Sequence, residues 1–370
     1  MKARASRWVV CLATLRLLDA ARAAEVHVSL PEDTSAAPVL RGYAFNFPRD
    51  HGAHNRFRTE WWYITGWLHT RNDTALGFQV TFFRSRTPTD LIQGNPSAFA
   101  PAQILIAHSA LSDPAHGRLR QEQRIARAGF GLAQAAETDT QVSIDRWRLR
   151  RTETGYQASI DGEEFSLELN MQALQPPLLN GEKGFSQKSP VPGSASYYYS
   201  VPQLSVGGTV KRNGAAEPVT GTAWLDHEWS SEYLDPEAAG WDWTGINFDD
   251  GSSLMAFRIR GKHGQPRWAG ATVRDADGVA HALTPDEINF TPIRQWRSER
   301  TGISYPIAWR VRAGSREFEL QPLLDDQEND TRATTGAIYW EGAVNASGGG
   351  KIMGRGYLEL TGYGEGLKLR

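Results

Sequence analysis

Two short motifs each occur twice along this chain of 370 residues, and each copy of the pair begins and ends a similar run of β-rich segments. The sequence Trp-Tyr-Ile-Thr-Gly at residues 62–66 resembles Trp-Asp-Trp-Thr-Gly at residues 241–245, and a hairpin with an apolar return strand follows each copy. The sequence Gly-Thr-Ala-Trp-Leu-Asp at residues 221–226 resembles Gly-Arg-Gly-Tyr-Leu-Glu at residues 354–359. Such a repeat indicates that one structural unit is formed twice. The sequence therefore predicts two related domains in tandem.

Most of the chain between the motifs consists of short runs of β-branched and aromatic residues, separated by turn residues. Residues 64–69 and 76–83 are typical, since the polar turn Arg-Asn-Asp separates two predicted strands. An antiparallel run of strands must protect its edges, and closure into a barrel does so. We therefore expect two antiparallel β-barrels, with a pair of β-sandwiches as the alternative. The best helical candidate is residues 121–137, which Gly129 and Gly131 interrupt.

The first 24 residues have the pattern of an export signal. Lys2, Arg4 and Arg7 precede an apolar stretch at residues 8–18, and Ala-Arg-Ala at residues 21–23 is a small-x-small cleavage site. We expect a periplasmic or secreted protein with domains at residues 25–235 and 236–370 and no membrane-spanning segment after cleavage. The only cysteine, Cys11, lies in this leader, so the mature chain would carry no thiol chemistry.

The formal net charge of −2 shows no basic excess, which makes nucleic acid an unsuitable partner. No Gly-x-Ser-x-Gly elbow is present, and His227-Glu228 is not followed by a second histidine at zinc-protease spacing. Asp50, His51 and His54 could begin a metal site, but no third ligand lies near them in sequence. The sequence therefore predicts no cofactor and no metal.

Tryptophan, histidine and acidic residues gather in a few motifs that together resemble one family. The motifs are Pro-x-Asp-His at residues 48–51 with His54, Glu-Trp-Trp-Tyr at 60–63, Tyr-Tyr-Tyr-Ser at 197–200, Trp-Leu-Asp-His-Glu-Trp at 224–229, and the closing segment 356–363. With them the chain resembles the AttH family, which includes the carotenoid 1,2-hydratases (hydroxyneurosporene synthases) and bacterial proteins described as secreted hydrolases. The resemblance covers nearly the whole chain after the leader and is closer to the secreted branch. It implies an all-β fold of two tandem lipocalin-like (calycin) barrels.

The family chemistry requires an acid and an aromatic pocket. Hydrating an alkene begins with protonation of one carbon by a positioned acid, and the ring faces of aromatic residues stabilise the resulting cation. The acid candidates are Asp226, His227, Glu228 and Glu60. The candidate ligand-binding residues are Trp61, Trp62, Tyr63, Tyr199, Trp224, Trp229, Trp241 and Trp243. The resemblance implies a further proton donor on the following hairpin, but residues 253–260 contain no carboxylate, and Asp249 and Asp250 lie in its turn.

Three functions remain open at this point. The first is binding of a small hydrophobic, isoprenoid- or lipid-like ligand, with acid-assisted hydration as its possible reaction. The second is a non-catalytic periplasmic carrier or an accessory of an envelope transporter. The third is a secreted hydrolase with no recognisable nucleophile. Each candidate acid also has a structural alternative; Glu60, for example, could pair with Arg58 or cap the barrel mouth.

Overall fold

Two antiparallel sheets account for almost all of the described chain. The computed structural model describes residues 36–88, 97 and 100–364. Both sheets belong to one compact unit. The helical elements among the described residues are two short 3-10 turns, η1 (Arg49–His51) and η2 (Pro285–Glu287). The predicted leader, residues 1–24, lies outside the described residues. Within the described ranges no helix is long and apolar enough to cross a membrane.

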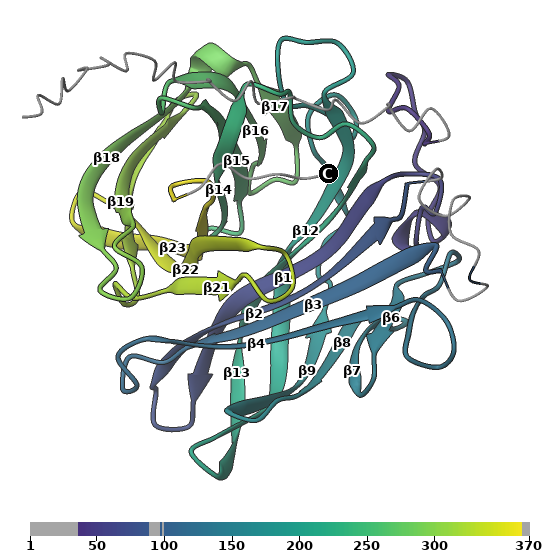
Figure 1. The fold of residues 1–370 in the computed structure, drawn as a ribbon. Helices are drawn as coiled ribbons and strands as arrows, with labels where there is room; N and C mark the ends of the chain where they lie inside the picture. The colour runs from purple at the N-terminus through teal and green to yellow at the C-terminus, as the bar shows by residue number, and fades with distance from the viewer. Residues whose placement is uncertain (1–35, 89–96, 98–99, 365–370) are drawn as a thin grey trace, which may run out of the picture. The chain divides into compact units, whose positions relative to one another are not determined.

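The first sheet has thirteen strands and runs from purple to teal in Figure 1. Its strand order is β4-β3-β2-β1-β13-β12-β9-β8-β7-β6-β5, and β10 and β11 also pair with β12. The strands are β1 (Thr59–Thr70), β2 (Ala75–Arg86), β3 (Gln103–Ser112), β4 (Leu119–Arg127), β5 (Ala133–Ala135), β6 (Gln141–Ile144), β7 (Trp147–Arg151), β8 (Gly155–Asp161), β9 (Phe165–Gln172), β10 (Leu178–Leu179), β11 (Phe185–Gln187), β12 (Ala195–Arg212) and β13 (Ala215–Ser230).

The second sheet has ten strands and runs from green to yellow. Its order is β17-β16-β15-β14-β23-β22-β20-β19-β18, with β21 paired to β22. The strands are β14 (Ala238–Phe248), β15 (Ser253–Gly261), β16 (Pro266–Arg274), β17 (Ala280–Leu283), β18 (Ile288–Arg297), β19 (Ser304–Ala313), β20 (Arg316–Pro322), β21 (Glu328–Thr331), β22 (Ala337–Gly348) and β23 (Lys351–Leu360).

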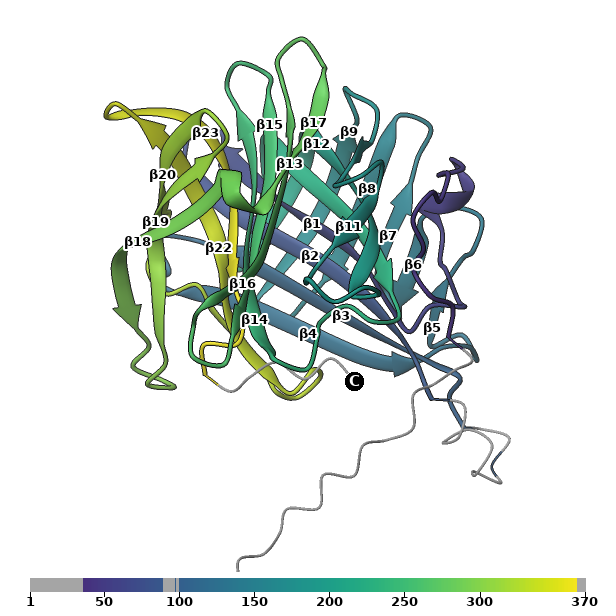
Figure 2. The same cartoon turned by 90° about the horizontal axis from the view of Figure 1, so that it is seen from above.

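The two strand orders are equivalent, because in each sheet the first strand pairs with both the second and the last. Thus β1 pairs with β2 and β13, and β14 pairs with β15 and β23. This pairing curls each sheet round, as Figure 2 shows from above. In the first sheet β3 and β4 contact β6 across the remaining opening, so the barrel is nearly closed. The predicted all-β fold of two tandem lipocalin-like barrels is confirmed, in place of two sandwiches.

The motif repeat marks these pairing strands, but its first pair is offset by one residue. Tyr63 lies opposite Asp226, and Trp243 lies opposite Glu359, so Tyr63 and Trp243 are the structural equivalents. The sequence alignment instead matched Trp62 to Trp241, which lie on opposite faces of their strands. A slip of one residue exchanges the two faces of a strand. The equivalence of Asp226 with Glu359 keeps the same face in both sheets.

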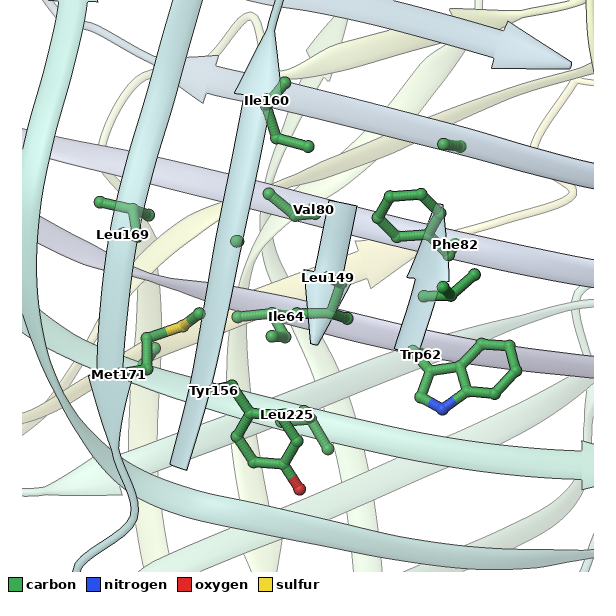
Figure 3. Packing of buried hydrophobic residues seen from close by; sticks show 14 of the residues in the cluster. Trp62, Ile64, Val80, Phe82, Leu149, Tyr156, Ile160, Leu169, Met171 and Leu225 are labelled. Carbon is green, nitrogen blue, oxygen red and sulfur yellow. The ribbon is translucent and has the colours of Figure 1, made fainter. Parts of the chain in front are cut away.

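Side chains fill the interior of each barrel. Every second residue of β8 and β9 points inward, and Figure 3 shows Ile160, Leu169 and Met171 in the same apolar cluster as Ile64 and Phe82 of β1 and β2. A second apolar cluster fills the barrel of β14–β23. Each large apolar side chain that is fully buried in this way contributes about 1.5–3 kcal/mol relative to exposure.

A third apolar cluster lies between the two sheets. The outer face of β1 supplies Tyr63 and Trp67, and the second sheet supplies Trp243 and Tyr357. The Trp67 indole donates a hydrogen bond of 3.0 Å to the carbonyl oxygen of Gly356, which joins the sheets directly. The strands at this seam are therefore buried on both faces, which explains their nearly continuous apolar sequence.

The prediction of a helix at residues 121–137 is wrong. The segment forms the end of β4, a turn and β5 (Ala133–Ala135). Gly129 and Gly131 have φ angles of 91° and 73°, in the left-handed region, so the backbone reverses there and cannot continue as a right-handed helix.

Two adjacent glycines of β12 provide a test of the close pairing between β12 and β9. A Cβ atom on Gly208 would lie 2.1 Å from the backbone oxygen of Glu168, whereas a Cβ on Gly207 would meet nothing within 4 Å. We expect Gly208→Ala to lower the free energy of unfolding by about 1–3 kcal/mol, and the matched control Gly207→Ala to change it by less than about 0.5 kcal/mol. Urea denaturation measures both. Equal effects of the two substitutions would contradict the close pairing of β12 with β9 at Gly208.

Candidate functional site

The four candidate acids divide between two places, because neighbouring residues of a strand point to opposite faces. On β13 the side chain of His227 points into the first barrel with Leu225 and Trp229. The side chains of Asp226 and Glu228 point the other way, into a cavity between the two sheets. Glu60 borders this cavity, but its carboxylate is bonded within the first barrel. The structure therefore contains an inner network and a separate cavity.

The inner network is centred on the fully buried carboxylate of Glu60. It accepts hydrogen bonds from the backbone N–H of His54 at 2.8 Å and from Arg84 Nε at 2.8 Å. It also lies 2.7 Å from His54 Nδ1 and 2.9 Å from His227 Nε2. Four nitrogen atoms from three residues thus surround the carboxylate, all within the barrel. Arg84 also donates hydrogen bonds to the carbonyl oxygens of His54 and Phe57.

Charge sets the protonation of this network. Although burial alone would raise it, the pKa of Glu60 is held well below its usual range by Arg84 and His54. Burial lowers the pKa of His227 to about 4, so this imidazole is neutral at pH 7. The pKa of His54 is raised despite burial, because Glu60 and Asp50 lie on its two sides. Two carboxylates therefore flank the His54 imidazole and favour its charged form.

Hydrogen bonds extend the network to both sides. On one side His227 Nδ1 lies 3.0 Å from the Tyr199 hydroxyl, which in turn lies 2.8 Å from His51 Nδ1. On the other side His54 Nε2 lies 3.3 Å from Asp50, which accepts a hydrogen bond from the Tyr43 hydroxyl.

Three of the predicted ligand-binding aromatics pack against this network rather than line the cavity. The Trp62 ring stacks on His227 with centroids 4.8 Å apart, and the Trp229 ring stacks on His54 at 3.7 Å. Tyr199 is bonded between His227 and His51, as described above. All three side chains are buried, so their contacts are with the network itself.

His54, Glu60 and His227 have the donor types of a metal site, with ligand atoms within 4.8 Å of one another. However, Glu60 already accepts bonds from both histidines, and the positive charge of Arg84 lies 2.8 Å from it. A cation placed there would have to displace these bonds and would be repelled by the guanidinium. We therefore assign the three residues to a hydrogen-bonded network.

The second barrel also has a buried acid in its interior, but among the described residues no histidine is bonded to it. Asp242 lies in its interior and is bonded to Arg258 at 2.6 Å and to Arg260 at 3.0 Å. The Tyr363 hydroxyl donates to the same carboxylate at 2.8 Å. Arg84 and Arg260 are equivalent positions by strand register. The histidine-rich arrangement is therefore a feature of the first barrel and not of the repeated unit.

The cavity between the sheets has a volume of about 280 Å³. Four of the predicted ligand-binding residues line it, namely Trp61, Tyr63, Trp241 and Trp243, while Trp224 packs behind them in the apolar cluster between the sheets. Tyrosines that the sequence analysis did not select complete the wall. The cavity residues outside the predicted set include Phe83, Ile106, His108, Tyr198, Tyr233, Tyr339, Glu341 and Glu359.

Asp226 is the acid of the first sheet in this cavity. Its carboxyl accepts hydrogen bonds from the Tyr198 hydroxyl at 2.6 Å, the Ser200 hydroxyl at 2.5 Å and the Trp224 indole at 2.7 Å. Burial, with a smaller contribution from the nearby Glu228, raises the pKa of Asp226 to about 7 against the effect of these donors. A substantial fraction of Asp226 is therefore protonated at neutral pH.

Glu228 is paired with a buried lysine. Lys188 Nζ lies 2.7 Å from Glu228 and 3.0 Å from the Ser186 hydroxyl. The ammonium also faces aromatic rings, with the centroid of Phe257 at 4.2 Å. Burial lowers the pKa of Lys188, and Glu228 opposes that shift. Lys188 lies in the Gly-Glu-Lys-Gly-Phe-Ser-Gln-Lys-Ser stretch at residues 181–189, but sequence alone gave no reason to place it beside Glu228.

A second pair of acids comes from the other sheet. Glu341 on β22 and Glu359 on β23 are directly opposite each other. Burial raises the pKa of Glu359 to about 7, and burial together with Glu359 raises that of Glu341 well above its usual range. Glu359 is the repeat equivalent of Asp226, so the closing motif of each half delivers one acid to the same cavity. The repeated motif was the available signal for Glu359, whereas Glu341 had none.

The hairpin acids are placed differently. Asp249 and Asp250 lie in the exposed turn between β14 and β15, where Asp250 accepts bonds from the backbone and hydroxyl of Ser252 at 2.9 and 2.5 Å. These bonds lower the pKa of Asp250. Neither aspartate lines the cavity.

Comparison with known proteins places this architecture. A profile of the AttH-like family matches residues 38–363. The chain belongs to the AttH-like family. A crystal structure described as an AttH protein of Nitrosomonas europaea is 54% identical, with a TM-score of 0.83, and the match covers 89% of this chain and all (100%) of that one. Kievitone hydratase from Nectria haematococca has the same fold at 14% identity, with a TM-score of 0.66 over 90% of this chain and 98% of that one. Comparison with curated proteins finds no match.

The ion pair between Glu60 and Arg84 provides a test of the inner network of this AttH-like protein. Glu60→Gln would leave the buried guanidinium of Arg84 without its charge partner, and we expect a loss of about 3–5 kcal/mol in the free energy of unfolding. Thermal and urea unfolding at pH 7 measure this loss. The matched control is Glu319→Gln, which removes an exposed partner of Arg310 and should cost less than about 1 kcal/mol. A comparably small effect of Glu60→Gln would contradict the assigned network.

Proposed function

We propose that this AttH-like protein binds one small, largely apolar molecule in the cavity between its two barrels and can deliver a proton to it from Asp226. The observation that carries the proposal is an aromatic-walled cavity of about 280 Å³ with a buried carboxyl group in its wall, that of Asp226, whose pKa burial raises to about 7. Small-molecule sites combine mostly apolar walls with a few placed polar groups. The interior of the first barrel is packed with side chains, which favours the cavity between the barrels over the barrel itself.

Acid-assisted hydration is the reaction that the geometry supports best. Asp226 would transfer its proton to one alkene carbon, the neighbouring carbon would become cationic, and water would add there and return a proton to the carboxylate. Trp61, Trp241 and Trp243 present rings to a developing cation. Kievitone hydratase has the same fold, but at 14% identity this likeness is evidence about the fold alone. Export to the periplasm by the predicted leader is part of the proposal, and a non-catalytic carrier or accessory of an envelope transporter is the alternative to it.

Filling the cavity tests the binding step. Ala337 lines the cavity at the start of β22, so Ala337→Phe would place a ring in the space. We expect the neutral fluorescent probe N-phenyl-1-naphthylamine to bind the native protein with one site, and the affinity to fall at least about tenfold in this variant. The matched control Ala280→Phe, on the exposed strand β17, should bind the probe normally. If the native protein does not bind the probe, or Ala337→Phe binds it equally well, the cavity is not a ligand site.

Proton delivery by Asp226 is tested with the isoprenoid ketone geranylacetone in water labelled with ¹⁸O. We expect a tertiary alcohol carrying the label, formed about 10²–10⁴-fold more slowly by Asp226→Asn. Because the pKa of Asp226 is raised to about 7 and the protonated form is required, the rate should be highest below that pH and decline above it. Asp249→Asn, in the hairpin turn, serves as the control. Absence of labelled product with the native protein would leave a non-catalytic carrier as the function.

A further inference from the structure

Three of the carboxyl groups around the cavity between the barrels have no cationic partner among the described residues. Two of its acids have cationic partners, since Glu60 is bonded to Arg84 and Glu228 to Lys188. Among the described residues, Asp226, Glu341 and Glu359 form no salt bridge. The remaining basic group in the wall, His108, has a pKa lowered to about 3 by burial, so it is neutral. The cavity therefore holds three carboxyl groups without a positive charge among the described residues.

Two of the buried polar atoms in the wall also lack partners. Glu341 is 3% exposed, and its Oε1 atom has no hydrogen-bond partner among the described residues. The hydroxyl of Tyr63, which is 7% exposed, lies beside the carboxyl group of Glu341 and interacts with it, but the two groups do not meet hydrogen-bond geometry. A buried polar atom without a partner costs free energy unless a ligand supplies one. An unpaired carboxyl oxygen can accept a hydrogen bond, and a nearby cation would favour the ionised form of this acid.

The rest of the wall is aromatic. Trp61, Trp241 and Trp243 lie around the same space, and the indole of Trp241 donates a hydrogen bond of 3.0 Å to Glu359. Carboxylates set among ring faces are the combination that binds organic ammonium ions. An inorganic cation such as Ca²⁺ would need about 6–8 oxygen ligands, which a wall of rings does not provide.

We propose that the molecule held between the barrels carries an ammonium group on an apolar body, with the ammonium at Glu341 and Glu359 and the apolar part against Phe83, Ile106 and Trp61. This inference rests on the proposed function and adds the chemical class of the ligand. The positive group meets the acids of the second sheet, and the apolar part lies within reach of Asp226 on the first.

The charged and titratable groups that face Glu359 determine how binding depends on pH. They are Asp226 and the Glu228–Lys188 pair on the first sheet, and Glu341 beside it. The phenols of Tyr63, Tyr198, Tyr233 and Tyr339, and neutral His108, also line the space. A bound cation favours the ionised form of Glu359, whose pKa is raised to about 7. The affinity for a permanently charged ammonium should therefore rise from pH 5.5 to pH 8, with protons released on binding.

Two ligands of the same shape and different charge test the proposal. Benzyltrimethylammonium and its neutral carbon isostere, neopentylbenzene, compete with N-phenyl-1-naphthylamine for the native, full-length protein. At pH 8 we expect the ammonium ligand to displace the probe at a concentration at least about tenfold lower than the isostere. Between pH 8 and pH 5.5 the affinity for the ammonium ligand should fall, while that for the isostere should change little.

Two single substitutions and one control locate the preference. Glu359→Gln should reduce the preference for the ammonium ligand to less than about threefold and weaken its pH dependence, since the glutamine cannot ionise whereas Asp226 and Glu341 still can. Glu341→Gln should also reduce the preference, which keeps the test informative if one variant does not fold. Glu317→Gln, at an exposed site, should leave the preference unchanged.

The outcomes separate this inference from the proposed function. If the probe binds and the isostere competes as well as the ammonium ligand, the cationic class is wrong and the apolar site stands. The same conclusion follows if the preference survives in both Glu341→Gln and Glu359→Gln. If neither ligand nor the probe binds, both the site and the inference fail.

Discussion

The pairing of β1 with β13, with both strands buried on both faces, is the constraint on which the rest of this structure depends. One face of each strand closes the first barrel, and the other face is covered by the second sheet. Because side chains alternate along a strand, consecutive residues serve different environments. Asp226 and His227 are neighbours in sequence, yet one lies in the cavity and the other in the network around Glu60.

The two environments shift acids in opposite directions. Inside the first barrel, Arg84 and His54 supply enough positive charge to keep the pKa of Glu60 low although it is fully buried. In the cavity the desolvation is similar but the compensating charge is absent, so the pKa values of Asp226 and Glu359 rise to about 7. An ionised carboxylate inside an apolar shell holds the barrel together, whereas a protonated one beside an open space is available for chemistry.

Much of the fold could be predicted from sequence because the constraints on it are local. The repeated motifs fall on the strands that close each barrel, and turn residues separate the hairpins where predicted. The one-residue offset between Trp62 and Trp241 could not be seen in the sequence. Matching Trp62 to Trp241 and matching Tyr63 to Trp243 both align aromatic residues, and only the residue paired across the sheet distinguishes the two alignments. The helix predicted at residues 121–137 failed because tertiary pairing overrode a weak periodicity.

The site was predictable in its members and less so in its grouping. Composition and motifs selected Glu60, Asp226, His227 and Glu228. Their division between the inner network and the cavity follows from the alternation of side chains along β13 and from the second sheet, which covers the outer face of the first. Lys188, Arg84 and Glu341 come from strands and loops distant in sequence, and no spacing rule links them to their partners. Charge compensation in particular is a property of three-dimensional neighbours, so its absence at Glu341 and Glu359 was invisible beforehand.

The origin of Asp226 and Glu359 from equivalent positions of two separate barrels has a mechanical consequence. Each acid is fixed to a rigid sheet, and their mutual repulsion and shared exclusion of water depend on how closely the sheets approach. A movement of one barrel away from the other would admit water and lower the proton affinity of both groups together. The pKa values of these two side chains thus depend on the distance between the two sheets, and a separation of the sheets would release protons from them.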